Sequence, residues 1–284
     1  MASRAKHPLH DTITIGANLT VGRMGFGAMR ITGPGIWGPP NDRAAAVALV
    51  RHVVDAGVSF IDTADSYGPY VSEEIIAEAL APYADDIVIA TKAGFVRSGP
   101  GQWAIDARPE RLRKCAEGSL RRLKRDCIDL FQLHRIDPRV PMEESLGVLT
   151  VLQREGKIRH IGLSQISVDE YERAKKMATI VSVQNRYNVE DRSSEDVLDA
   201  CERDGSVFLP WAPLGGTGSP KHAALKRIAT AHRGKPAQVA LAWLLARSHS
   251  ILPIPGTSSI AHFDENLKAV ELVLTAAELE ELSS

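Results

Sequence analysis

The amino-acid sequence predicts one domain over residues 1–284, an α/β fold in which an N-terminal β-hairpin precedes a (β/α)8 TIM barrel. Eight short apolar runs alternate with amphipathic segments, and this order produces a parallel sheet closed by helices. The runs are almost continuously hydrophobic, as strands buried on both faces require. No linker or low-complexity stretch divides the 284 residues, and this length suits a single barrel.

The elements follow in order along the chain. Two alternating runs, 11–15 and 19–22, surround a Gly/Asn turn and predict a hairpin that closes the bottom of the barrel. The predicted strands are 24–28, 58–62, 87–91, 128–134, 158–163, 180–184, 207–211 and 251–255. The predicted helices are 42–56, 72–81, 109–124, 141–155, 168–177, 194–204, 237–247 and, at the end, about 260–272. Asn41 or Asp42 can cap the first helix, and Gly57 can end it. The stretches 33–40 and 94–108 are expected to be loops.

A doubly wound sheet is the main alternative fold. It requires the pattern G-x-G-x-x-G between its first strand and first helix, where the backbone approaches a dinucleotide. The chain has Gly25 and Gly27 at the first two positions but Arg30 at the third. The sequence therefore favours the barrel.

Composition excludes several classes of protein. The chain has 34 Lys and Arg against 35 Asp and Glu, so no bulk positive field exists to bind nucleic acid. No apolar run reaches the roughly 18 residues that a membrane span needs. Cys115, Cys127 and Cys201 are widely spaced, which argues against a disulfide framework or a zinc site. The first eleven residues lack the apolar core of a signal peptide, so we expect a cytoplasmic protein.

Polar residues that could do chemistry stand at or just after three consecutive strands. Asp62 ends the second strand, Tyr67 follows it, Lys92 ends the third and His134 ends the fourth. Functional residues of this fold collect at the carboxyl ends of the strands. Each residue alone is more often structural, but together they form a proton-donating site. A Lys cation should make a nearby phenol more acidic, Asp62 would hold that cation, and His134 could orient a carbonyl oxygen. Such a site needs a hydride or electron source that side chains cannot supply.

Five motifs are spread along the chain: GVSFIDTADSYG (57–68), ATK (90–92), DLFQLHR (129–135), GKIRHIGLS (156–164) and IPGTSSIAHFDENL (254–267). Through these motifs the sequence resembles the aldo-keto reductases over nearly its whole length. The resemblance implies a barrel that binds an extended nicotinamide cofactor without a separate dinucleotide domain. It also implies a catalytic tetrad of Asp62, Tyr67, Lys92 and His134, with Tyr67 as the acid.

The resemblance also implies where the cofactor binds. The residues implied to bind the nicotinamide carboxamide are Ser164, Gln165 and Gln184. The residue implied to stack on the nicotinamide ring is Trp211. The full set of implied cofactor residues is Ala28, Met29, Asp62, Ser164, Gln165, Gln184, Trp211, Ala212, Pro213, Leu214, Gly215, Gly216, Pro255, Gly256, Thr257, Ser258, His262, Glu265 and Asn266.

Four positions depart from the family pattern. Gln165 replaces the usual Asn, and Trp211 replaces a common Tyr, which a flat stacking role tolerates. Gly256 and His262 stand where many relatives have Lys and Arg, the cations that suit a 2′-phosphate. We still expect NADP(H) in preference to NAD(H).

Within the family, the resemblance is closest to bacterial pyridoxal reductases. The marks are AMRITGPGIWGPP (28–40), YGP (67–69), NRYN (185–188) and PGTSSIAH (255–262). They imply reduction of pyridoxal to pyridoxine, with Trp37, Tyr67, Trp103 and His134 against the substrate. A broad-specificity reductase of small aldehydes and ketones is the alternative.

Two other classes of function are weighed. Some relatives serve as channel-associated subunits, so the chain could be a non-enzymatic NADP(H) sensor, but no added interaction segment is visible. A metal-dependent hydrolase or isomerase could use Asp62, Asp65 and His134, but Lys92 would repel the metal and no His-x-His pair occurs. No metal site is expected. The sequence leaves the oligomeric state open.

Overall fold

The computed structural model describes residues 11–215 and 223–283. Seven parallel strands form one curled sheet in the order β11-β10-β9-β8-β5-β4-β3. They are β3 (Phe26–Gly27), β4 (Phe60–Asp62), β5 (Val88–Ala93), β8 (Ile128–Leu133), β9 (Ile158–Ser164), β10 (Ile180–Gln184) and β11 (Val207–Phe208). The predicted barrel is confirmed, although its first, second and seventh strands are shorter than expected.

The eighth predicted strand closes the ring without forming a regular ladder. On one side, Phe208 N donates to Ser250 O at 2.8 Å and Leu252 N donates to Phe208 O at 2.9 Å. On the other side, Gly25 N donates to Pro253 O and Gly27 N donates to Pro255 O. Proline has no N–H, so this segment offers few donors to its neighbours. We call the junction between 251–255 and β3 the seam.

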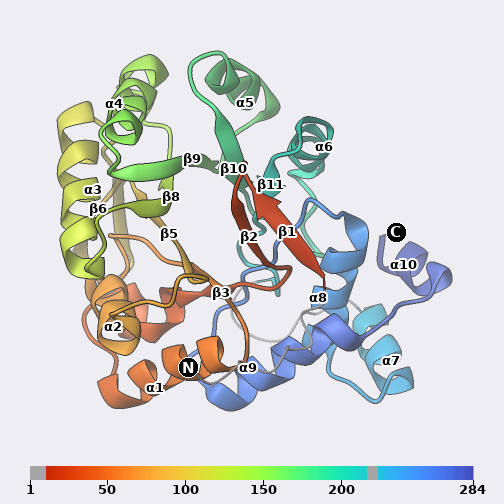
Figure 1. Ribbon diagram of the computed structural model, residues 1–284. Coiled ribbons are helices and arrows are strands. Elements are labelled where there is room, and N and C mark those ends of the chain that lie inside the picture. The colour runs from red at the N-terminus through yellow and green to blue at the C-terminus, as the bar shows by residue number, and fades with distance from the viewer. Residues whose placement is uncertain (1–10, 216–222, 284) are drawn as a thin grey trace.

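Helices surround the sheet (Figure 1). They are α1 (Arg43–Asp55), α2 (Val71–Leu80), α3 (Pro109–Leu123), α4 (Met142–Arg154), α5 (Val168–Lys175), α6 (Glu195–Asp204), α7 (Ala223–Ala231), α8 (Pro236–Arg247), α9 (Ile260–Leu267) and α10 (Ala276–Ser283), with 3-10 turns η1 (Ala28–Ile31), η2 (Pro34–Ile36) and η3 (Lys268–Glu271). The side chain of Asp42 caps α1 by accepting from Ala45 N, and Gly57 follows with a φ of 93°. The sequence did not predict α7 or α10.

The N-terminal hairpin lies at one end of the barrel. Strands β1 (Thr12–Ile15) and β2 (Leu19–Gly22) pair in antiparallel fashion. Their inward side chains, among them Ile15 and Leu19, pack with Phe60 and Leu130 from the barrel interior. The hairpin therefore closes the bottom of the barrel, as expected.

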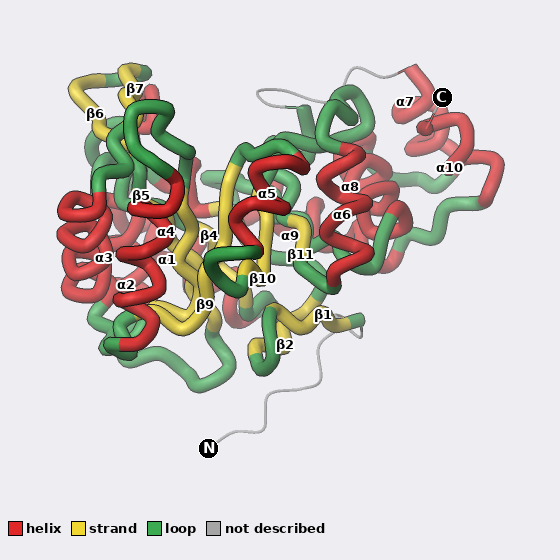
Figure 2. Tube along the Cα trace, turned by 90° about the horizontal axis from the view of Figure 1, so that it is seen from above, coloured by secondary structure: helices red, strands yellow, loops and turns green. Residues whose placement is uncertain are grey.

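A second hairpin stands at the opposite end (Figure 2). The stretch 94–108 was expected to be a loop, but it forms β6 (Phe95–Gly99) and β7 (Gln102–Ile105), which pair in antiparallel fashion. Most side chains of this hairpin are half-buried or exposed, so it carries little of the hydrophobic pattern by which strands are recognised.

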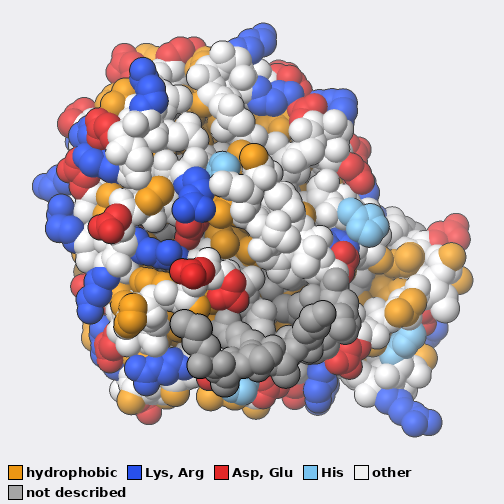
Figure 3. Space-filling model, in the orientation of Figure 1, with side chains coloured by type: hydrophobic (Ala, Val, Ile, Leu, Met, Phe, Trp, Pro, Cys, Tyr) orange, Lys and Arg blue, Asp and Glu red, His pale blue; other side chains and the backbone are white. Residues whose placement is uncertain are grey.

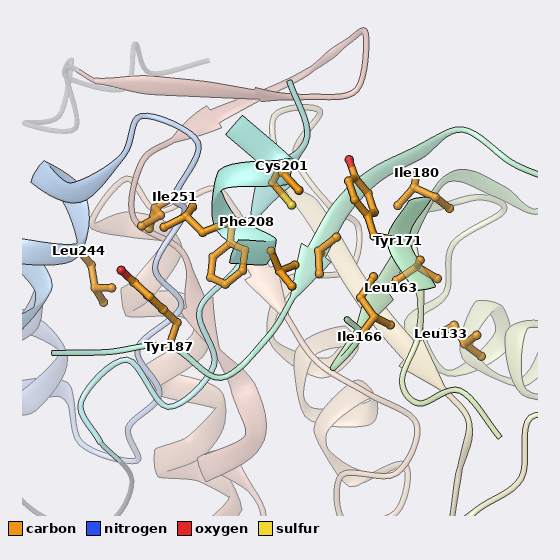
Figure 4. Packing of buried hydrophobic residues seen from close by; sticks show 14 of the residues in the cluster. Leu133, Leu163, Ile166, Tyr171, Ile180, Tyr187, Cys201, Phe208, Leu244 and Ile251 are labelled. Atoms are coloured by element: carbon orange, nitrogen blue, oxygen red, sulfur yellow. The ribbon is translucent and has the colours of Figure 1, made fainter. Parts of the chain in front are cut away.

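The largest apolar cluster lies between the sheet and the helices. Figure 4 shows part of it, from Leu133 and Leu163 through Phe208 to Ile251 and Leu244. Tyr187 stacks on Trp243 with ring centroids 5.7 Å apart. This rigid layer fixes the strand ends that carry the site described below.

Acidic and basic side chains are intermixed on the face that carries the β1–β2 hairpin (Figure 3). This distribution agrees with the formal net charge of −1. None of the described helices is both long and apolar enough to cross a membrane.

Candidate active site

The carboxyl ends of the barrel strands surround one cleft of about 480 Å³. Asp62, Ser164 and Gln184 are the last residues of β4, β9 and β10, and His134 directly follows β8. The lining comprises Gly27, Met29, Arg30, Ile36, Asp62, Tyr67, Phe95, Trp103, His134, Arg135, Ser164, Gln184, Trp211, Ala212, Pro213, Leu214, Ile254, Pro255 and Gly256. Strand ends distant in sequence thus converge on one space, as the barrel predicts.

A buried lysine joins the two acidic members of the site. Lys92 Nζ donates to Asp62 Oδ2 at 2.6 Å, to the Thr63 carbonyl oxygen at 2.8 Å and to the Tyr67 hydroxyl at 3.4 Å. Lys92 is fully buried, whereas Tyr67 is 7% exposed and lines the cleft. The cation therefore lies behind the phenol, where it can act on the phenol without occupying the cleft.

Two glutamines complete the surroundings of Asp62. Gln184 Nε2 donates to Asp62 Oδ1 at 2.8 Å, and Gln132 Nε2 donates to the same oxygen at 3.2 Å. One carboxylate oxygen thus faces the cation and the other accepts two amide hydrogens. Because buried charges are costly unless paired and hydrogen-bonded, this arrangement offsets the cost of placing Asp62 in the wall of the cleft. The sequence analysis did not single out Gln132, whose position in β8 gives it no distinguishing signal.

Burial and charge act in opposite directions on Tyr67. Burial raises the pKa of Tyr67 above its ordinary value, and the Lys92 cation acts to lower it. The phenol was expected to be more acidic than a free tyrosine, and this expectation is wrong because burial outweighs the effect of Lys92. Lys92 alone does act in the expected direction, toward a lower pKa of Tyr67. For Lys92 itself, burial acts to lower the pKa, but Asp62 and Tyr67 leave it raised. At neutral pH the pair is a protonated phenol beside an ammonium.

His134 is neutral in this site. Burial first, and then the charges of Lys92 and Arg135, lower the pKa of His134 well below its ordinary value. Its Nδ1 lies 3.5 Å from Ser66 Oγ, and its ring packs edge-on to Tyr67 and Phe95 at centroid distances of 6.0 and 4.7 Å. A neutral imidazole can donate one hydrogen bond to a polar ligand without adding charge.

Arg97 on β6 ties three loops together above the cleft. Its guanidinium donates only to carbonyl oxygens, those of Gly35, Ile36, Ser66, Gly99 and Gln102, at 2.8 to 3.3 Å. Its guanidinium carbon also lies 3.6 Å from the ring centroid of Trp103 and 5.6 Å from that of Trp37. Arg97 thus connects η2, the loop that carries Tyr67 and the β6–β7 hairpin. We call this group the Arg97 clamp.

Two residues that depart from the family pattern contact each other. Trp211 Nε1 donates to Gln165 Oε1 at 2.8 Å, and Arg186 N donates to the same oxygen at 3.4 Å. Gln165 and Ala212 both have positive φ values, 55° and 50°, which are uncommon for residues with a side chain. Such backbone strain gathers at ligand sites. Gln165 lies outside the cleft lining and holds the indole of Trp211.

The end of the cleft at the seam has the features of a phosphate cradle. A Cβ on Gly256 would lie 2.6 Å from the carbonyl oxygen of Gly27, so only glycine fits there. The side chain of Arg30 lies beside Gly256, because its Cγ would be 3.6 Å from a Cβ placed on Gly256. The helix α9 begins four residues later, at Ile260, and helix N-termini favour anions. Arg30 is exposed and has no ion pair with any described residue, so its cation is free to meet a ligand.

The predicted site residues divide into two groups. Thirteen line the cleft, and Lys92 lies directly behind it. Ala28 is buried, and Trp37 faces the Arg97 clamp in place of the cleft. Outside the lining are Gln165, Gly215, Thr257, Ser258, His262, Glu265 and Asn266, most of them along the start of α9; Gly216 lies outside the described residues.

The structure adds six lining residues that the sequence analysis did not single out. They are Gly27, Arg30, Ile36, Phe95, Arg135 and Ile254. Arg135 directly follows His134 in the sequence, and only this adjacency could have indicated that Arg135 lines the cleft. Asp65, considered above as a metal ligand, is buried outside the lining, where its carboxyl group lies near the Cys115 thiol.

Comparison with known proteins agrees with this geometry. Residues 23–284 match the model of the aldo/keto reductase family. The chain is 44% identical over 266 residues to an oxidoreductase of Schizosaccharomyces pombe, covering 93% of this chain and 86% of the relative. It is 42% identical over 271 residues to pyridoxine 4-dehydrogenase of Escherichia coli, covering 93% and 94%.

Solved structures show the same fold. An aldo-keto reductase of Klebsiella pneumoniae in complex with NADPH superposes with a TM-score of 0.81 at 28% identity, over 96% of this chain and 93% of that one. A thermostable aldo-keto reductase in complex with the inhibitor epalrestat gives a TM-score of 0.85 at 30% identity, over 96% and 98%. The chain therefore belongs to the aldo-keto reductase family and is an NAD(P)H-dependent oxidoreductase.

Proposed function

We propose that the protein reduces a small aldehyde or ketone to the alcohol with NADPH, and that pyridoxal, reduced to pyridoxine, is its substrate. The observation that carries the reaction is the contact of Lys92 Nζ with both Asp62 and the Tyr67 hydroxyl. A protonated phenol lines the cleft, and a cation behind it stabilises the phenolate that remains when the proton leaves. A proton donor of this kind contributes about 10²- to 10⁴-fold to a rate.

The residues present fit an extended nicotinamide cofactor. Trp211 offers a flat ring held by Gln165, and Ser164 and Gln184 offer polar groups at neighbouring strand ends. Arg30 supplies the cation that Gly256 cannot, and Thr257, Ser258 and His262 stand at the start of α9. When bound, the nicotinamide would supply the hydride to the carbonyl carbon. The NADPH complex of the Klebsiella pneumoniae relative supports the phosphorylated form of the cofactor.

The chain's own residues then have separate tasks. Tyr67 gives its proton to the carbonyl oxygen, and Lys92 holds the resulting phenolate while Asp62 holds Lys92. Neutral His134 donates a hydrogen bond to the same oxygen and so orients the carbonyl. The rings of Phe95 and Trp103, with centroids 5.2 Å apart, form an aromatic wall that suits a flat substrate. The name of the Escherichia coli relative supports pyridoxal as that substrate.

The test is Tyr67→Phe, with Tyr70→Phe as the matched control because Tyr70 is exposed and outside the cleft. We expect Tyr67→Phe to lose turnover by at least about 100-fold while NADPH binding, followed by nucleotide fluorescence, stays within about twofold. Normal turnover in Tyr67→Phe would exclude the proposed acid. The wild type should be assayed with pyridoxal, benzaldehyde and methylglyoxal, each with NADPH and NADH. NADPH binding without turnover of any carbonyl compound would favour the cofactor-sensor alternative.

A further inference from the structure

Arg135 is a partly buried cation at the reacting end of the cleft. It directly follows β8 and lies beside His134 in the lining. Its Nη1 donates to the His134 carbonyl oxygen at 2.6 Å and to Ser164 Oγ at 3.2 Å. Its guanidinium carbon lies 5.2 Å from the ring centroid of Phe95. Two contacts through one nitrogen, together with an aromatic face, hold the group in place.

Arg135 lacks the anionic partner that Arg122 and Arg125, two other partly buried arginines, have, and it also lacks the five carbonyl acceptors that surround Arg97. Arg122 pairs with Glu73 at 2.6 Å, and Arg125 pairs with Asp129 at 3.2 Å. Among the residues that the structure describes, none offers Arg135 a carboxylate within 4 Å, and its Nε and Nη2 have no acceptor. Its exposed fraction is intermediate, and burial lowers its pKa. Removing a cation from water without a counter-charge is costly, so a ligand that brings an anion would gain from meeting it.

The charges of the cleft lining leave Arg135 uncompensated. Among the described residues that line the cleft, Asp62 alone has a carboxylate, and it is held by Lys92. His134 is neutral for the reasons given above. The other cation is Arg30, which lies at the seam beside Gly256.

The ring order separates the two arginines. Arg135 follows β8, the fourth position of the ring, whereas Arg30 follows β3 and adjoins the eighth segment. The fourth and eighth positions of an eight-membered ring face each other across it. Arg30 therefore suits the cofactor's phosphates, and Arg135 is left for the substrate.

We propose that Arg135 binds an anionic oxygen of the substrate, so that the enzyme prefers small carbonyl compounds that carry a phenolate or carboxylate close to the carbonyl group. This inference rests on the proposed carbonyl reduction. The free Nε and Nη2 form a guanidinium edge, which is suited to paired oxygen acceptors. Pyridoxal has this chemistry, because its ring hydroxyl next to the aldehyde is ionised at neutral pH.

The test compares aldehydes of the same shape that differ in charge. Carboxybenzaldehydes with the carboxylate in the ortho, meta or para position are paired with the corresponding nitrobenzaldehydes, in which the nitro group is flat and neutral. The measured quantity is the ratio of kcat/KM for each anionic aldehyde to that for its neutral partner. This ratio cancels any general damage to His134 or Ser164, since such damage affects both substrates alike.

We expect the wild type to prefer at least one carboxybenzaldehyde, and Arg135→Met to lower that preference by about 10- to 100-fold, the range for a hydrogen bond to a charged group. Arg135→Lys should recover part of it, because the charge remains but the fork is lost. Arg154→Met is the matched control, because Arg154 is exposed on α4 and donates only to Thr150 within its own helix. An unchanged ratio in Arg135→Met overturns the proposal. A large loss of NADPH affinity with an unchanged ratio also overturns it and assigns Arg135 to the cofactor.

A binding measurement keeps the inference separate from the proposed reaction. The alcohol 3-(hydroxymethyl)benzoate, whose carboxylate is closer to the reacting carbon than in the para isomer, is titrated into the protein with NADPH, and nucleotide fluorescence reports binding; 3-nitrobenzyl alcohol is the neutral partner. If Arg135→Met loses affinity for the anionic alcohol but not for the neutral one, the anion site is supported even if no aldehyde is turned over. Equal affinities of wild type and Arg135→Met for the anionic alcohol overturn it.

Discussion

Replacing Lys92 by Met tests whether the ion pair below the cleft serves the reaction or the fold. The side chains have similar length, and Lys92 is fully buried, so the main change is the loss of charge and of three hydrogen bonds. Asp62 would keep its charge with only the amides of Gln132 and Gln184 as donors. Removing one partner of a buried pair in this way costs about 3–5 kcal/mol of unfolding free energy.

The double variant Lys92→Met/Asp62→Asn separates the two roles. It removes both charges, and the Asn carbonyl oxygen can still accept from Gln184. We expect it to recover at least about 2 kcal/mol relative to Lys92→Met, because no uncompensated charge remains. Turnover should stay about 10²-fold or more below wild type in both variants, since Tyr67 has lost the cation that stabilises its phenolate.

The assay is urea unfolding followed by circular dichroism, together with kcat for an aldehyde with NADPH. Lys157→Met is the control, because Lys157 forms surface pairs with Glu117 and Glu155 that are worth at most about 1 kcal/mol. A double variant as unstable as the sum of its single variants would refute the reasoning, as would Lys92→Met with normal turnover.

Three further predictions follow from charged groups near the cleft. Burial, and then the charge of Glu73, raise the pKa of Asp65 to about 7, so between about pH 4 and 7 the folded chain keeps a proton that the unfolded chain has lost. The free energy of unfolding should therefore fall as pH rises through this range. Asp65→Asn should make this fall smaller, and should raise the urea midpoint at pH 8 but not at pH 4. An Asp65→Asn variant that loses the same unfolding free energy at both pH values contradicts this. Arg97→Met should raise KM for aromatic aldehydes about 10-fold by loosening the Arg97 clamp, with the dissociation constant of NADPH within about twofold; a proportional loss of NADPH affinity would show that the clamp serves the cofactor. Arg30→Met should weaken NADPH about 10-fold and NADH little in a fluorescence titration, and equal weakening of both would remove Arg30 from phosphate recognition.

The ring itself could be predicted because its signals are local. Continuous apolar runs such as 128–134 and 180–184 mark strands buried on both faces, and Asp42 and Gly57 mark helix ends through backbone requirements. The hairpin β6–β7 lacks such a signal, since neither of its faces packs on the core. The 251–255 run has the hydrophobicity of a strand, but its prolines prevent a regular ladder.

The candidate site could be predicted in part for a related reason. Asp62, Tyr67, Lys92 and His134 stand at strand ends, and the barrel brings strand ends together. The part played by Arg97 or Arg135 depends on which acceptors surround a guanidinium in space, and sequence spacing carries no information on that. The family resemblance implied that Gly256 stands where many relatives have a cationic residue, but only the structure places Arg30 beside it.

The seam lies between two groups of implied cofactor residues, so nucleotide binding should stabilise this junction of the barrel. There the Gly25 and Gly27 amides bond to Pro253 and Pro255, and the implied cofactor residues stand on both sides, Ala28 and Met29 after β3 and Gly256 and Thr257 after the last segment. A dinucleotide that contacts both sides would hold together a junction at which the structure has no regular strand ladder. The amide hydrogens of Gly25 and Gly27 should then exchange with deuterated solvent markedly more slowly when NADPH is present, although neither amide needs to touch the nucleotide.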